Sequence, residues 1–222
     1  MLDCIELANT PKPDACVIWL HGLGADGYDF VPIVKEIEAL GAPAARYVFP
    51  HAPMRPVTIN GGNVMRAWYD IVGTDLLRPE DESGIRQSHL EVEALIAREV
   101  DRGISRSRLV LAGFSQGGAI TLHTGLRQSQ PLAGLLALSS YLPLASAFEA
   151  ERDAGSAQVP IFIAHGQSDP VIPIARGAES RERLVALGYE VQWHAYPIPH
   201  SVCADEVRDI AVFLRTVLAR SE

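Results

Sequence analysis

The sequence of 222 residues predicts one α/β domain, with a mostly parallel β-sheet flanked by helices and no large cap domain. Short unbroken apolar runs, which suit strands buried on both faces, alternate along the chain with segments of helical periodicity. No linker or internal repeat divides residues 1–222. Such alternation is typical of βαβ units, so the strands should lie side by side and point the same way.

The predicted strands are short, and most of them are uniformly apolar. The first 15 residues are more polar and read as an edge segment. Buried strands are predicted at 15–20, 47–49, 108–112, 135–138 and 161–164, followed by an alternating strand at 190–196.

Helices are predicted where apolar residues recur every three or four positions. The clearest covers 83–101, and Ser83 is a suitable N-cap for it. The other predicted helices cover 28–40, 116–127, 175–187 and 203–219.

The region 50–82 has no regular period and is rich in proline and glycine. A short strand at 67–71 is the one element predicted within it. An irregular segment of this length in a compact domain is typical of a functional loop or of a disordered stretch.

Composition and charge exclude several classes of protein. Hydrophobic residues make up 48% and charged residues 21%, which is typical of globular proteins. The net charge of −8 argues against a generally basic nucleic-acid binder. No apolar stretch reaches the roughly 18 residues of a membrane helix, and the N-terminus lacks the pattern of a secretory signal. We therefore expect neither nucleic-acid binding nor stable membrane insertion.

The three cysteines are Cys4, Cys16 and Cys203, an odd number without a CxxC motif. This usage suits free thiols in a reducing compartment, so we expect a cytoplasmic protein. A disulfide between Cys16 and Cys203 is the alternative.

The strongest motif is Gly113-Phe-Ser115-Gln-Gly117, which lies between the predicted strand 108–112 and the predicted helix 116–127. A serine on such a sharp turn projects its hydroxyl above the sheet edge, and the small flanking residues let the turn close. The helix N-terminus favours negative charge that develops nearby. The alternative is a glycine-rich helix entry with Ser115 as a cap, but the strand–turn–helix context favours a nucleophile.

A serine hydroxyl needs a base. When an acid and a histidine assist such a serine, the chain order is serine, acid, histidine, which leaves His165, His194 and His200. His194 lies within the predicted strand 190–196, where a packed side chain is the simpler interpretation. His200 lies in the following loop, at the sheet edge expected to hold Ser115, and is the predicted base.

The predicted acid is Asp169, which follows the strand 161–164 and precedes Pro170. Its role would be to accept the N–H of His200, fix the tautomer and stabilise the imidazolium. A plain Asp-Pro turn is the alternative.

Acyl transfer also requires donors for the oxyanion. The backbone N–H of Gln116, directly after the nucleophile, is one candidate. The second is the N–H of Leu23 in the segment HGLG, which follows the strand 15–20 and whose glycines permit close approach to a substrate. A simple glycine turn is the alternative for this segment.

Metal and nucleotide chemistry are not indicated. His21 and His165 each precede a glycine at a strand end, but no carboxylate or cysteine has metal-site spacing to them, so they are assigned structural roles. The dinucleotide-binding and P-loop patterns are absent. We expect no metal and no cofactor.

These motifs resemble the small α/β-hydrolase carboxylesterases of bacteria, which are related to the acyl-protein thioesterases and lysophospholipases of eukaryotes. The resemblance runs from about Val17 to the final helix, in the segments VIWLHGLGADGYDF, FPHAPMRPVTINGGNVMRAWYDI, GFSQGGA, LSSYLP, HGQSDPVIP and YPIPHSVCADEV. It implies the α/β-hydrolase fold and the same catalytic and oxyanion residues.

The resemblance further implies that the segment 73–82 lines or covers an acyl groove. Trp68, Leu76, Leu77 and Val171 are then the expected apolar contacts of the acyl chain. Alternatively, Leu76 and Leu77 pack on the core. Homodimers occur among relatives, so the resemblance also makes a homodimer an expectation to test.

The predicted function is a serine esterase that hydrolyses small-molecule carboxylic esters through an acyl-enzyme. The alternative is a thioesterase acting on acylated proteins, or a lysophospholipase, with the same mechanism. A non-enzymatic binding scaffold is disfavoured because the chain retains all three residues of the triad. A peptidase has no recognisable specificity pocket in the sequence.

Overall fold

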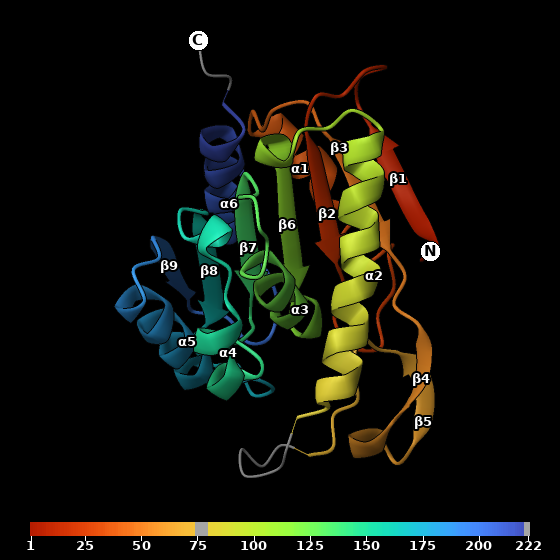
Figure 1. Ribbon diagram of the computed structural model, residues 1–222, viewed down its shortest axis with the longest axis vertical. Helices are drawn as coiled ribbons and strands as arrows, with labels where there is room; N and C mark the ends of the chain where they lie inside the picture. Colours follow the sequence, from red (N-terminus) through yellow and green to blue (C-terminus); the bar gives the residue numbers. More distant parts are fainter. Residues whose placement is uncertain (74–79, 220–222) are drawn as a thin grey trace.

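The computed structural model describes residues 1–73 and 80–219, and within them seven strands form one sheet in the order β1-β3-β2-β6-β7-β8-β9 (Figure 1). All neighbours pair in parallel except β1, which runs antiparallel to β3 at one edge. The strands are β1 (Cys4–Ala8), β2 (Cys16–Leu20), β3 (Arg46–Pro50), β6 (Leu109–Phe114), β7 (Gly134–Leu138), β8 (Ile161–Gly166) and β9 (Val191–Tyr196). The predicted α/β class and its mostly parallel sheet are confirmed.

Helices cover both faces of the sheet (Figure 1). One apolar core lies between the sheet and α2, α3, α4 and α5, and a second lies between the sheet and α1 and α6. The unbroken apolar strands follow from this arrangement, because each central strand must bury both of its faces. The helices are α1 (Ile33–Ala39), α2 (Glu82–Asp101), α3 (Gln116–Gly125), α4 (Ala145–Glu151), α5 (Ile174–Ala186) and α6 (Ala204–Val217).

A two-stranded antiparallel hairpin stands apart from the main sheet. It consists of β4 (Met54–Val57) and β5 (Asn63–Arg66), and its turn contains Gly61 and Gly62 with φ of 70° and 78°. Figure 1 shows it beyond the end of the sheet at which β2 and β6 terminate. The predicted strand at 67–71 is wrong, because the chain there is irregular although Ala67 to Tyr69 are buried.

Two helix predictions also need correction, and one helix was missed. Helix α1 begins at Ile33 rather than at residue 28, since residues 28–32 form turns. The N-cap of α2 is Asp81 and not Ser83, because the Asp81 carboxylate accepts the N–H of Gly84 at 2.9 Å. Helix α4 was not predicted at all, and it has only seven residues.

Cys4, Cys16 and Cys203 are all free thiols, so the alternative disulfide is absent. No helix within the described residues is long and apolar enough to cross a membrane.

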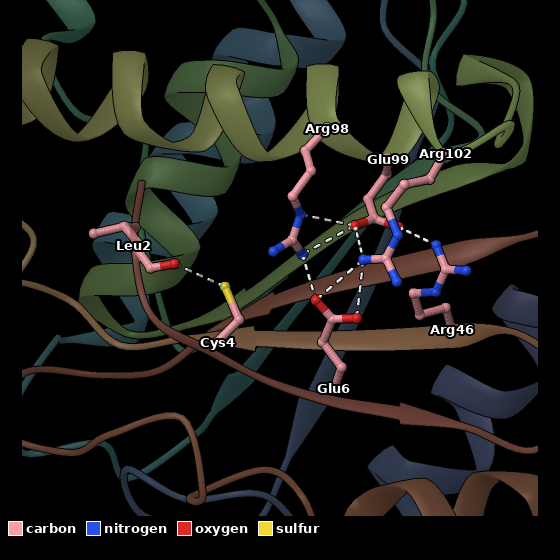
Figure 2. A network of polar contacts seen from close by, with 7 residues as sticks. All are labelled: Leu2, Cys4, Glu6, Arg46, Arg98, Glu99 and Arg102. Atoms are coloured by element: carbon pink, nitrogen blue, oxygen red, sulfur yellow. Dashed lines mark hydrogen bonds and ion pairs between the residues drawn. The ribbon is translucent and has the colours of Figure 1, made fainter.

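A buried carboxylate ties α2 to the edge of the sheet (Figure 2). Glu99 is fully buried, and its oxygens lie 2.6 Å from Arg46, 2.9 Å from Arg98 and 3.0 Å from Arg102. Arg98 and Arg102 also form ion pairs with Glu6 on β1. Each buried charge is therefore paired, which offsets the cost of removing Glu99 from water.

We expect Glu99→Gln to destabilise the fold by about 2–4 kcal/mol, because it leaves three arginines with one carboxylate. For a chain of this size that is a fall in Tm of about 5–15 °C. Glu149→Gln on the exposed face of α4 is the matched control and should shift Tm little. Equal Tm values for the two variants would show that the network contributes no net stability.

A second prediction concerns Glu206 in the first turn of α6. Burial raises the pKa of its carboxyl from 4.5 to about 8. At a pH between these two pKa values, Glu206 is ionised in the unfolded chain but keeps its proton in the folded protein. The wild type therefore loses stability as pH rises through this range. Glu206→Gln removes this loss, and its Tm should exceed that of the wild type by about 5–10 °C near pH 8 but not near pH 4.5.

The control for this experiment is Asp205→Asn, which removes the same charge from an exposed neighbour in the same helical turn. Its Tm should follow that of the wild type across the pH range. A Glu206→Gln advantage that does not grow with pH would contradict the account.

Candidate active site

Ser115 occupies a strained turn between β6 and α3. Its backbone has φ of 55° and ψ of −118°, a region that non-glycine residues rarely adopt. The Ser115 N–H donates to the carbonyl of Leu138 at 2.8 Å, and the Ser140 hydroxyl donates to the Ser115 carbonyl at 2.7 Å. Contacts with β7 and with the residues that follow it therefore hold the strained turn in place.

The glycines around Ser115 are required by close backbone contacts. A Cβ on Gly113 would lie 2.3 Å from the Gly117 carbonyl carbon, and one on Gly117 would lie 2.3 Å from the Leu20 carbonyl oxygen. Both distances are far below any normal contact, so α3 could not pack this closely against β2 and β6 with alanine at either position. This packing places the N-terminus of α3 directly behind the Ser115 side chain.

The structure brings the predicted triad together from three loops. The Nε2 of His200 lies 3.0 Å from the Oγ of Ser115, and its Nδ1 lies 2.6 Å from the Oδ2 of Asp169. Both contacts are within hydrogen-bonding distance. With the Nδ1 proton directed to the carboxylate, Nε2 is free to accept the serine proton.

Asp169 is itself held in place by its own turn. Its Oδ1 accepts the N–H groups of Val171 at 2.8 Å and Ile172 at 2.9 Å, and the residue is only 8% exposed. His165, fully buried, places its Nε2 2.8 Å from the Ile172 carbonyl oxygen and 3.5 Å from Asp169 Oδ2. Burial lowers the pKa of His165, so this ring stays neutral and supports the acid loop, in agreement with its predicted structural role.

Two backbone N–H groups beside Ser115 have no backbone acceptor among the described residues, those of Leu23 and Gln116. Both residues line the same pocket as Ser115. The loop that carries Leu23 is fixed by His21, whose Nε2 accepts the Ala52 N–H at 3.0 Å and whose Nδ1 lies 2.7 Å from the Gly22 carbonyl oxygen. Two free donors on rigid backbone suit an oxyanion hole.

The side chain of Gln116 has a second role that the sequence did not reveal. Its Oε1 accepts the Trp68 N–H at 2.7 Å, and its Nε2 donates to the Tyr69 carbonyl at 2.7 Å. The irregular segment after β5 is therefore clamped to the first residue of α3. The sequence indicated only the backbone N–H of Gln116 as a donor. The role of its side chain was missed because its partners, Trp68 and Tyr69, are distant in sequence.

Trp68 does not lie where an acyl chain could touch it. It is fully buried, and its indole N–H donates to the His21 carbonyl at 2.9 Å. It supports the HGLG loop from beneath and is not among the residues that line the pocket. The expected contact between Trp68 and the acyl chain is corrected accordingly.

A pocket of about 640 Å³ opens beside Ser115. Val171, which is 60% exposed, is among the residues that line it, and its contact with an acyl chain stays a prediction. Leu76 and Leu77 lie outside the described residues. The pocket also contains residues that the sequence analysis did not single out: Ile59, Asn60, Tyr69, Ile71, Tyr141, Ile172, Arg176 and Glu179.

The arrangement can support nucleophilic attack on an acyl carbon. The hydroxyl of Ser115 has a base at hydrogen-bonding distance, the base is oriented by a buried carboxylate, and two free N–H donors face the same pocket. No cluster of three or more metal-ligating side chains occurs in residues 1–73 and 80–219.

Comparisons with known proteins show which proteins this chain is similar to. The model of the phospholipase/carboxylesterase family matches residues 4–218. Acyl-protein thioesterase 1 of Neurospora crassa is 40% identical over 90% of this chain and 85% of its own length. That of Mycosarcoma maydis is 39% identical over 93% of this chain and 92% of its own length.

Solved structures show the same similarity. The crystal structure of Arabidopsis thaliana SOBER1 has a TM-score of 0.85 at 30% identity, over 92% of this chain and 99% of that chain. The structure of Zea mays acyl-protein thioesterase 2 also has a TM-score of 0.85, at 25% identity over 99% of this chain and 100% of that chain.

The clamp made by Gln116 generates a prediction. Gln116→Ala keeps the backbone donor but leaves a buried N–H and a buried carbonyl unpaired, so we expect a loss of about 2–4 kcal/mol in stability. Thermal unfolding measures the loss. Gln87→Ala, at an exposed position of α2, is the control and should leave Tm nearly unchanged. A Gln116→Ala protein as stable as this control would mean that the clamp is dispensable.

Proposed function

Because the chain belongs to the phospholipase/carboxylesterase family, a family of serine hydrolases, we propose that Ser115, Asp169 and His200 hydrolyse acyl esters through an acyl-enzyme, with acyl thioesters as the preferred substrates. That the chain is a hydrolytic enzyme follows from the family. The choice of residues rests above all on one observation, the unbroken contact from Ser115 through His200 to Asp169.

The proposed reaction has two halves. His200 takes the proton of Ser115 as the hydroxyl oxygen attacks the carbonyl carbon, and the N–H groups of Leu23 and Gln116 hold the resulting oxyanion. His200 then donates its proton to the departing thiolate or alkoxide, leaving an acyl-serine. Water repeats the sequence, so that the carboxylic acid leaves and Ser115 is regenerated.

The preference for thioesters is supported by the relatives. The curated relatives that are about 40% identical over about nine-tenths of this chain carry the name acyl-protein thioesterase. Hydrolysis of oxygen esters, the activity favoured by the sequence analysis, is the second candidate. The family description, which names phospholipases and carboxylesterases, favours it. Both activities use the same residues, so only substrates can separate them.

Ser115→Ala should lower kcat/KM for any ester or thioester substrate by at least about 10³-fold, since the remaining donors and binding contacts cannot replace the nucleophile. The rate of hydrolysis of 4-nitrophenyl octanoate measures the effect. Ser107→Ala, at a surface position in the 3-10 helix Arg106–Arg108, controls for the loss of a hydroxyl and should retain wild-type activity. Full activity in Ser115→Ala would contradict the proposed mechanism.

Paired substrates test the thioester preference. The octanoyl group is presented as a thioester and as an alkyl ester with leaving groups of matched size, and kcat/KM is divided by the rate of hydroxide-catalysed hydrolysis of each. We expect the corrected ratio to favour the thioester. A ratio that favours the oxygen ester would identify the second candidate as the true activity.

A further inference from the structure

One wall of the pocket beside Ser115 is built from two tyrosines and an arginine. Tyr69, Tyr141 and Arg176 all line the pocket, and Arg176 lies in the first turn of α5. The guanidinium carbon of Arg176 lies 3.8 Å from the centroid of the Tyr141 ring. At this distance the cation lies against the aromatic face, which restricts its position in the pocket wall.

Arg176 forms no ion pair within the part of the chain that the structure describes. No carboxylate of the described residues lies within 4.0 Å of its nitrogens. Glu179 lines the same pocket but is exposed. Glu80 accepts the Leu144 N–H at 2.8 Å and interacts electrostatically with Arg176, but burial raises the pKa of its carboxyl by more than these two contacts lower it. A cation on a half-buried pocket wall that forms no ion pair among the described residues favours a ligand that brings a negative charge.

The hydroxyl of Tyr141 adds a second donor. The two phenolic oxygens of Tyr69 and Tyr141 lie 3.0 Å apart. Tyr69 is only 2% exposed and has no other side-chain hydrogen bond within the described residues, so its proton is satisfied only if it donates to Tyr141. The proton of Tyr141 is then free to bond a ligand in the pocket. Beside the guanidinium, the wall offers donors and suits an acceptor with negative charge.

The position of the pocket indicates which part of a substrate meets this wall. Ser115, Leu23 and Gln116 line it, whereas His200 is not among its lining residues. The leaving group must depart on the side of His200, which protonates it, so the chain of the acyl group extends into the pocket. Four apolar side chains also line the pocket: Ile59, Ile71, Val171 and Ile172.

We propose that Arg176 and Tyr141 form a subsite for a carboxylate at the far end of the acyl chain, so that the preferred substrates are half-esters or half-thioesters of dicarboxylic acids. This inference rests on the proposed function and names its acyl specificity. The methylene groups of the acid pack against the apolar side chains, and the terminal carboxylate binds the guanidinium and the phenol by charge-assisted hydrogen bonds.

The test uses 4-nitrophenyl half-esters of adipic, suberic and sebacic acid, whose carboxylates are too distant for ready attack on their own ester bond. Each is compared with the monoamide of the same acid, which has the same length without the charge. The readout is the ratio of kcat/KM for acid over amide. For the acid whose length fits, we expect the wild type to favour the carboxylate about tenfold or more, and added salt to lower the ratio.

Arg176→Met should lower this ratio about tenfold. Hydrolysis of the amides by the same variant shows that it folds, and the ratio of acid to amide corrects for any change in its general rate. Arg176→Lys should keep part of the preference, because it keeps the charge but not the planar donors. Arg183→Met removes an equal charge from an exposed site on the same helix, away from the pocket. It should keep the wild-type ratio, which excludes a general effect of net charge.

The outcomes separate the subsite from the proposed function. A wild-type ratio near one on every acid, or an unchanged ratio in Arg176→Met, would overturn the subsite while Ser115-dependent hydrolysis of the amides upholds the proposed function. Loss of the ratio in Arg183→Met as well would also overturn the subsite, since the preference would then come from net charge. If the wild type hydrolyses neither the half-esters nor the monoamides, both the subsite and the proposed function are overturned.

Discussion

The close packing of α3 against β2 and β6 is the constraint on which the rest of the site depends. Gly113 and Gly117 leave no room for a Cβ, and between them Ser115 adopts a left-handed conformation that most residues avoid. Strain of this kind persists only where neighbours determine the backbone. Here the Ser115 N–H donates to the Leu138 carbonyl and the Ser140 hydroxyl donates to the Ser115 carbonyl. The strain is compensated by the two buried cores on either side of the sheet.

Hydrogen bonds connect this turn to the other segments of the site. Gln116 binds the segment at Trp68 and Tyr69, and Trp68 in turn supports the loop of His21 that carries Leu23. On the other side, the N–H groups that follow Asp169 hold its carboxylate toward His200. The reacting groups are thus fixed before a substrate arrives, which is the condition for effective electrostatic stabilisation of an oxyanion.

The sequence predicted those parts of the molecule that depend on local pattern. Apolar runs indicated the buried strands, and the parallel sheet then placed Ser115, Asp169 and His200 at one edge, although 85 positions separate the first from the last. The parts that bury few residues, or that depend on partners distant in sequence, were not predicted. The hairpin of β4 and β5 was missed because it pairs only with itself and buries little, so its residues show no core periodicity.

Single residues show the same limit. Trp68 was expected to face the acyl chain, but a large aromatic side chain next to a loop can equally pack inward, and its partner His21 is 47 positions away. Arg176 looked like an ordinary charged residue on a helix. Its importance appears only once Tyr141, which is distant in sequence, is found beneath it in the pocket wall.

The central claim is that the packed turn makes Ser115 an activated nucleophile. The most direct measurement is labelling of the native protein with a fluorophosphonate, followed by digestion and mass spectrometry of the peptides. The account predicts one equivalent of phosphonate on the peptide that contains Ser115, and loss of labelling after denaturation, since an isolated serine hydroxyl is a poor nucleophile. An unlabelled Ser115 in the folded protein, or equal labelling of other serines, would contradict it.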